Sequence, residues 1–138
     1  MLANGTTLDY RTKGATEWTN AEMLLEIPDL GNDEEKVDRT HLACKNKRYE
    51  FGIGDYGDLE YKFIYDNSSP ASPYRVFREA QADKEVLEFK QTYPDKTAFE
   101  FSAMCNVKLT GGGVNGGIDF TLKLALQSDI TVTDPAGV

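Results

Sequence analysis

The sequence predicts a mainly β protein of one domain: an antiparallel β-sandwich or open barrel with one α-helix packed on it. Two observations lead to this class. Several segments alternate apolar and polar residues with a period of two, which is typical of strands that have one buried face. One other segment carries helix-start signals followed by helical apolar spacing. A length of 138 residues suits a single domain over residues 1–138 and is enough to bury a core.

The clearest strand predictions lie in the second half of the chain. Each places large apolar side chains on one face and polar side chains on the other, over residues 59–65, 87–93, 99–109 and 118–126. In the first of these, Leu59, Tyr61 and Phe63 alternate with Glu60 and Lys62. Successive side chains of a strand point to opposite faces, so these segments should be half-buried.

Three weaker strands are predicted earlier in the chain. Residues 6–13 are anchored by Leu8 and Tyr10. Residues 22–27 end before Pro28, which cannot donate a hydrogen bond to a neighbouring strand. Residues 39–51 are expected to hold one or two strands around a turn at residues 45–47.

The helix is predicted to start after a loop rich in Asn, Ser and Pro. Ser72 stands where an N-cap belongs and Pro73 at the first helical position. Val76, Phe77 and Ala80 continue with helical spacing, so the helix should end near Ala82 or Asp83.

Two loops are expected to be long. Residues 28–36 contain four acidic side chains, and residues 110–117 contain five glycines. The glycine-rich segment separates two strong strands, so it is predicted to be a flexible hairpin connection. A second interpretation is that this loop becomes ordered on contact with a partner.

Composition narrows the classes of function. The formal net charge of −8 argues against binding duplex DNA through its phosphates, which requires a basic face. The first residues lack the features of a secretory signal, and no apolar stretch is long enough to cross a bilayer. The chain is therefore expected to fold in the cytoplasm, without a membrane anchor, with Cys44 and Cys105 as buried free thiols.

No residue pattern predicts catalysis, a metal or a cofactor. Residues 52–57 match G-x-G-x-x-G by letter, but a strand follows where a dinucleotide site needs a helix, so a turn with positive-φ glycines is favoured. His41 is expected at the surface, and Cys105 lies on the apolar face of its strand as inert core. Trp18 is expected to anchor a hairpin or to lie at an interface.

Two other classes of function stay open on these residues. A ligand- or carbohydrate-binding β-module would need exposed aromatic side chains on one face, whereas the pattern places most of them inward. A small enzyme is the weakest interpretation, because no acid–base pair or nucleophile stands out.

The chain also resembles a known family, the tail tube (major tail) proteins of long-tailed, non-contractile bacteriophages. The resemblance lies in the order and spacing of several segments: residues 1–8, 25–31, 35–38, 40–42, 52–59 and 63–65. It implies a virion structural protein that self-assembles into homohexameric rings, which stack into a tube through which DNA passes without specific binding. It also implies tape measure, tail terminator and tail-tip proteins as partners, and assembly in the host cytoplasm. Terminators and baseplate hub components are related tail proteins that share the fold.

The resemblance suggests two sets of functional residues. A long loop at about residues 28–57 would contact the next ring, with candidate residues Asp29, Asp33, Glu34, Glu35, Lys36, Asp38, Arg39 and Tyr56. A tube lumen must not retain DNA, and acidic residues that point outward from the sheet suit it. The candidates for the lumen are Glu60, Lys62, Glu100, Asp119 and Lys123.

Overall fold

The computed structural model describes residues 1–31, 33–55, 57–114 and 116–135, and within them the chain is mainly β with one helix. The strands are β1 (Thr7–Thr12), β2 (Thr19–Asn20), β3 (Leu24–Glu26), β4 (Asp33–Asp38), β5 (Tyr49–Asp55), β6 (Leu59–Ile64), β7 (Val86–Thr92), β8 (Ala98–Thr110), β9 (Asp119–Leu126) and β10 (Thr131–Thr133). The helix is α1 (Pro73–Ala82).

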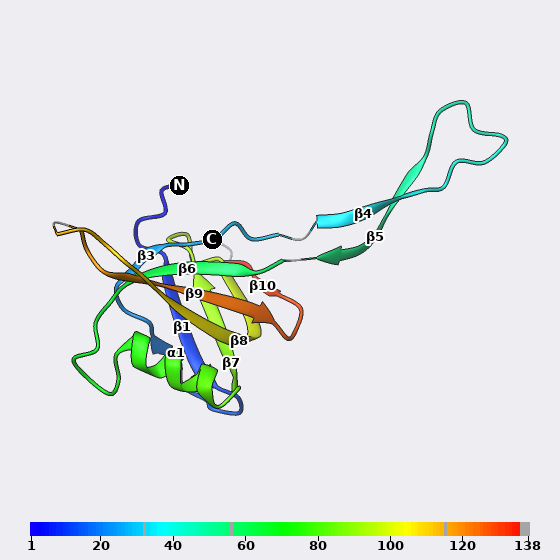
Figure 1. Cartoon of the computed structure of the whole chain (residues 1–138). Helices are drawn as coiled ribbons and strands as arrows, with labels where there is room; N and C mark the ends of the chain where they lie inside the picture. Colours follow the sequence, from blue (N-terminus) through cyan, green and yellow to red (C-terminus); the bar gives the residue numbers. More distant parts are fainter. Residues whose placement is uncertain (32, 56, 115, 136–138) are drawn as a thin grey trace.

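Most strands form one antiparallel sheet in the order β2-β1-β7-β8-β9-β6-β3. β10 pairs with the first residues of β8, next to the part of β8 that pairs with β9. The sheet curls into a half-barrel, and α1 lies against it (Figure 1). β4 and β5 form a second sheet of two strands, so the predicted open-barrel class with one helix is confirmed, with a separate hairpin attached.

The core lies between the concave face of the sheet and α1. Leu59, Tyr61 and Phe63 are at most 1% exposed, while Glu60 between them is exposed, as the alternation predicts. The register places Phe63 opposite Phe120, and their rings stack with centroids 5.1 Å apart. Phe77 of α1 is fully buried among these aromatic rings, so it joins the helix to the sheet. Burying one such side chain contributes about 1.5–3 kcal/mol.

The helix bounds agree with the prediction, but Ser72 acts differently. Its side chain makes no capping hydrogen bond to α1. Instead, Ser72 Oγ accepts a hydrogen bond from the Ser69 backbone N–H at 3.2 Å and closes the preceding loop. Pro73 at the first helical position has no N–H to satisfy, which reduces the need for a side-chain cap.

One buried polar pair interrupts the apolar core. The Tyr61 hydroxyl donates a hydrogen bond to Gln91 Oε1, and both residues are 0% exposed. Burial raises the pKa of Tyr61, so its hydroxyl stays protonated. Gln91 Nε2 has no partner among the described residues, which makes this pair costly to disturb.

The two cysteines differ. Cys105 is buried on the core face of β8, as predicted, and burial raises its pKa to about 12. The expectation of a buried thiol is wrong for Cys44, which is partly exposed in the connection between β4 and β5. That connection has no core of its own in which to bury it.

Several local predictions need correction. The expected loop at residues 28–36 contains the start of β4, because the charged segment from Asp33 pairs with β5. Residues 39–48 form a connection rather than strand, and β5 starts at Tyr49. Gly52 and Gly54 lie within β5 rather than in a turn, whereas Gly57 has the expected positive φ of 67°. The short strands β2 and β10 were not predicted.

The glycine-rich segment connects β8 and β9, as predicted. Its chain turns back tightly, and the Gly116 N–H donates to the Gly113 carbonyl at 2.9 Å. A Cβ at Gly112 would lie 2.9 Å from the Gly117 carbonyl oxygen, so this position requires glycine.

Candidate functional site

Two surfaces carry the side chains that could bind a partner. The first, here called the arm, consists of β4, β5 and the connection of residues 39–48 between them. The second, here called the outer face, is the side of the large sheet opposite α1. Figure 1 shows the arm projecting away from the sheet and helix.

The arm is an antiparallel hairpin that pairs only with itself among the described residues. Asp38 lies opposite Tyr49 and Lys36 opposite Phe51, with a register shift between Glu34 and Lys36. The register shift is a β-bulge or irregularity, and bulges increase the local twist of a hairpin. A two-stranded hairpin is marginally stable alone in water, so this arm gains from contact with another surface.

One side of the arm is aromatic. Tyr49 and Phe51 alternate on the same side of β5 and are 49% and 69% exposed. Lys36 Nζ lies 4.9 Å from the centroid of the Tyr49 ring, a cation–π contact that leaves the Phe51 ring open. Exposed rings of this kind are typical of residues that become buried at protein interfaces.

The tip of the arm, residues 39–48, is basic. It contains Arg39, Lys45, Lys47 and Arg48 and no acidic residue. Arg39 Nε lies 3.7 Å from Glu50 Oε2, an exposed ion pair that spans the two sides of the hairpin. The basic tip was not among the predicted features of this segment, although a count of the charged residues after Asp38 reveals it.

The base of the tip is held by short hydrogen-bonded turns. Asp38 Oδ1 accepts from the Thr40 N–H at 2.9 Å, and Thr40 Oγ1 accepts from the Arg48 N–H at 3.0 Å. The hydrogen bonds from Thr40 lower the pKa of Asp38. His41 is exposed at the tip, as predicted, and its Nδ1 accepts from the Ala43 N–H at 3.3 Å.

The predicted assembly residues mostly fall on the arm. Five of them lie on β4: Asp33, Glu34, Glu35, Lys36 and Asp38. Arg39 starts the tip, and Asp29 lies before the arm. Tyr56 lies outside the described residues. Their grouping on one projecting element is a result of the strand pairing, and their role in assembly stays a prediction.

The lumen candidates all lie on strands of the large sheet, with side chains on the outer face. Glu60 is directly opposite Lys123, and Asp119 is opposite Ile64. Lys123 Nζ lies 3.3 Å from Asp58 Oδ2. Lys62 lies between these pairs on β6, whereas Glu100 is further away on the first part of β8, opposite Lys90. The outer face is therefore polar and of mixed charge.

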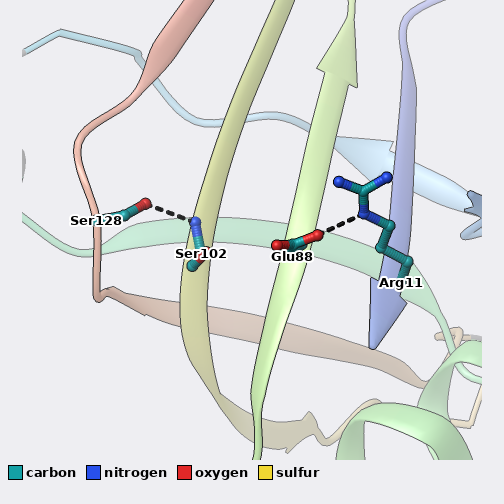
Figure 2. Close-up of polar contacts among 4 residues, drawn as sticks. All are labelled: Arg11, Glu88, Ser102 and Ser128. Carbon is teal, nitrogen blue, oxygen red and sulfur yellow. Dashed lines mark hydrogen bonds and ion pairs between the residues drawn. The ribbon is translucent and has the colours of Figure 1, made fainter. Parts of the chain in front are cut away.

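A hollow of about 380 Å³ lies on the outer face beside Glu100. Figure 2 shows the Arg11 Nε–H donating to Glu88 across β1 and β7, and the Ser102 N–H donating to Ser128 Oγ at 2.9 Å. The Arg11 guanidinium also lies 4.1 Å from the centroid of the Trp18 ring. Trp18 thus packs against the sheet from the β1–β2 hairpin, in agreement with its predicted anchoring role.

The chemistry of these surfaces is that of recognition. Within the described residues, no group of three or more His, Cys, Asp and Glu side chains is placed to hold a metal ion. In the same part of the chain, no helix is long and apolar enough to cross a membrane. The two features that stand out are an uncovered aromatic hairpin with a basic tip and a polar outer face.

No protein-family model matches the chain, and no curated protein matches it. Solved structures do match. A chain in the virion of a native gene transfer agent superposes with a TM-score of 0.71 at 16% identity, covering 96% of this chain and 98% of that one.

Two further structures give similar values. A chain from the tail of an empty gene transfer agent particle, determined with C6 symmetry, has a TM-score of 0.70 at 18% identity and covers 92% of this chain and 94% of that one. A chain in the baseplate of an anti-feeding prophage has a TM-score of 0.69 at 13% identity, with coverages of 94% and 92%. At these identities the likeness establishes a shared fold over nearly the whole chain.

Proposed function

We propose that this chain is a non-catalytic structural subunit of a phage-type tail. Six copies form a ring, and rings stack into a hollow tube through which DNA passes. The observation that carries this proposal is the shared fold with a chain from a gene transfer agent tail of C6 symmetry, which extends over 92% of this chain.

The arm supplies a physical reason for assembly. A hairpin with two exposed aromatic rings, which no other described part of the chain covers, needs a partner surface to bury them. A projecting element that docks on another copy makes a heterologous contact, which generates rings or stacks rather than closed dimers. The arm is therefore the proposed contact between rings, in agreement with the predicted loop of residues 28–57.

The outer face is the proposed lining of the tube. Its strands carry Glu60, Glu100 and Asp119, and the whole chain has a net charge of −8. A polar face of mixed charge, on a chain with an acidic excess, presents no continuous basic surface that would retain DNA by its phosphates. Tape measure, terminator and tail-tip proteins are the proposed partners, in a tail assembled in the host cytoplasm. Cryo-EM of assembled tubes tests this lining, and all three acidic residues on the outer wall would contradict it.

A related tail role is the second candidate. One matching structure is a baseplate, and another, covering 96% of this chain with a TM-score of 0.66 at 8% identity, contains a sheath/tube terminator of a contractile injection system. A terminator or baseplate component would form single rings, whereas a tube subunit adds ring after ring.

Negative-stain microscopy of concentrated protein separates these roles. Long tubes, with the purified protein alone or with tape measure protein and a tail-tip initiator, are the expected result. Single rings that never elongate would favour the terminator or baseplate role. Absence of any ring or tube under all these conditions would contradict both.

A further inference from the structure

We propose that the arm of one copy docks in a groove beside β3 of the next copy, with the basic tip against the acidic rim of that groove. This inference rests on the proposed function and identifies the receptor surface for the arm. It follows from three features of the described residues: an unpaired sheet edge, complementary charge, and the direction in which the arm leaves the body, the name used here for the large sheet together with α1.

The groove, here called the β3 groove, has a volume of about 510 Å³ and lies between residues 3–6 and 24–27. β3 is the last strand of the sheet, so its second edge has no strand partner in the described part of the chain. Leu25 lies at the register shift of β3 and is 47% exposed, and Met23 beside it is 45% exposed. Thr6 Oγ1 is buried in this lining without a hydrogen-bond partner among the described residues. The groove thus offers exposed apolar surface at Leu25 and an unpaired strand edge.

Charge complementarity selects a second copy of this chain as the occupant. The tip holds four of the 15 lysine and arginine residues and none of the 23 acidic ones, so 11 basic residues face 23 acidic residues in the rest of the chain. Glu26 lines the groove, and the exposed residues Glu22 and Asp29 lie just before and just after β3 in the chain. None of the three makes an ion pair among the described residues. Lys62 opposite Glu26 is the basic residue paired with this strand. The rim therefore keeps an acidic excess that attracts the tip.

Two other hollows fit the tip less well. The hollow beside α1, of about 570 Å³, is lined by Arg78 and Lys108 and would repel a basic tip. In the hollow beside Glu100, Arg11 already neutralises Glu88 (Figure 2), and Lys90 lies opposite Glu100 in the strand register.

The arm does not line the β3 groove of its own chain. It begins at Asp33, shortly after β3 ends at Glu26, and it projects away from the sheet (Figure 1). The aromatic side and the tip are therefore presented to another molecule, and the same contact can repeat from ring to ring without closing.

The native thiol of the tip allows a direct test. Cys44 is partly exposed and Cys105 is buried, so a short bis-maleimide reagent should react at Cys44 alone in the wild type. In a Leu25→Cys variant, tubes treated with this reagent should give a ladder of linked chains on a denaturing gel. Glu79→Cys, on an exposed position of α1, is the matched control and should give no ladder.

The outcomes separate this inference from the proposed function. A ladder for Leu25→Cys alone supports docking in the β3 groove. Normal tubes without a ladder, or with equal ladders from both variants, would overturn the docking but leave the tube role intact. Failure of the wild type to form any ring or tube would overturn both.

A charge exchange gives a second, independent measurement. Lys45→Glu with Lys47→Glu should raise the critical concentration for assembly by about tenfold, and Glu22→Lys with Glu26→Lys should do the same. Combining the four changes in one chain should restore assembly towards the wild-type value. Additive loss in the combined variant, with circular dichroism showing a folded protein, would contradict the pairing.

Discussion

The large sheet and the arm are both antiparallel, yet they use their aromatic residues in opposite ways. In the sheet, Phe63 and Phe77 are fully buried and contact each other and further rings. In the arm, Tyr49 and Phe51 are about half or more exposed. The difference is the second layer: α1 covers the concave face of the sheet, whereas none of the described residues covers the arm. Aromatic residues in the body should therefore control stability, and those in the arm should control association.

The largest effect is expected for Phe77→Ala. It removes a fully buried ring that joins α1 to the sheet, so the free energy of unfolding should fall by about 3–5 kcal/mol. Urea denaturation followed by circular dichroism measures this change. A loss below 1 kcal/mol would show that α1 is not part of the cooperative core.

Gln91→Leu tests the buried polar pair of the body. The substitution leaves the Tyr61 hydroxyl without its acceptor in the core, which should cost about 1–3 kcal/mol of stability. Tyr61→Phe with Gln91→Leu removes both polar groups and should recover part of this loss. If the double variant is no more stable than Gln91→Leu alone, the hydrogen bond does not explain the effect.

Unlike Phe77→Ala, Phe51→Ala should affect tube assembly and leave stability almost unchanged. The Phe51 ring is 69% exposed, so the free energy of unfolding should change by no more than about 0.5 kcal/mol. The critical concentration for tube assembly should rise by about tenfold, because the ring would be buried only in the assembly. Light scattering against protein concentration measures the second effect. A variant that loses stability and still assembles normally would contradict the distinction between the two regions.

The smallest effect concerns the two thiols. At pH 8, Cys44 should react with a maleimide in the folded monomer while Cys105 stays unmodified, because burial raises its pKa from 9.0 to about 12. On raising the pH, the Cys105 thiol ionises in the unfolded chain before it ionises in the folded protein. The contribution of this thiol to stability should therefore be fully present below about pH 9 and be lost as the pH rises towards 12. Mass spectrometry of labelled protein, with a denatured sample as control, counts the modified thiols. Two modified cysteines in folded protein would contradict the burial.

Local sequence patterns predicted the body better than the arm. β6 to β9 have one buried face, and that burial leaves an alternation that can be read without a structure. The side chains of β4 that the structure describes are exposed and mostly charged, which explains why its first residues fall in the predicted loop of residues 28–36. β2 and β10 are too short to leave any pattern. The basic residues of the tip are visible in the sequence, directly after the acidic residues that begin the arm.

The sequence by itself determined the fold class, the bounds of α1, the inward faces of the main strands and the inert position of Cys105. These four features can be read from the sequence because they depend on residues that are close together in the chain and on the alternation of side chains between the two faces of a strand. Tertiary structure alone decided that β4 and β5 pair with each other and project as an arm, and that β3 ends the sheet as an open edge. Strand order and pairing arise from contacts between distant residues, so they leave no local pattern to read.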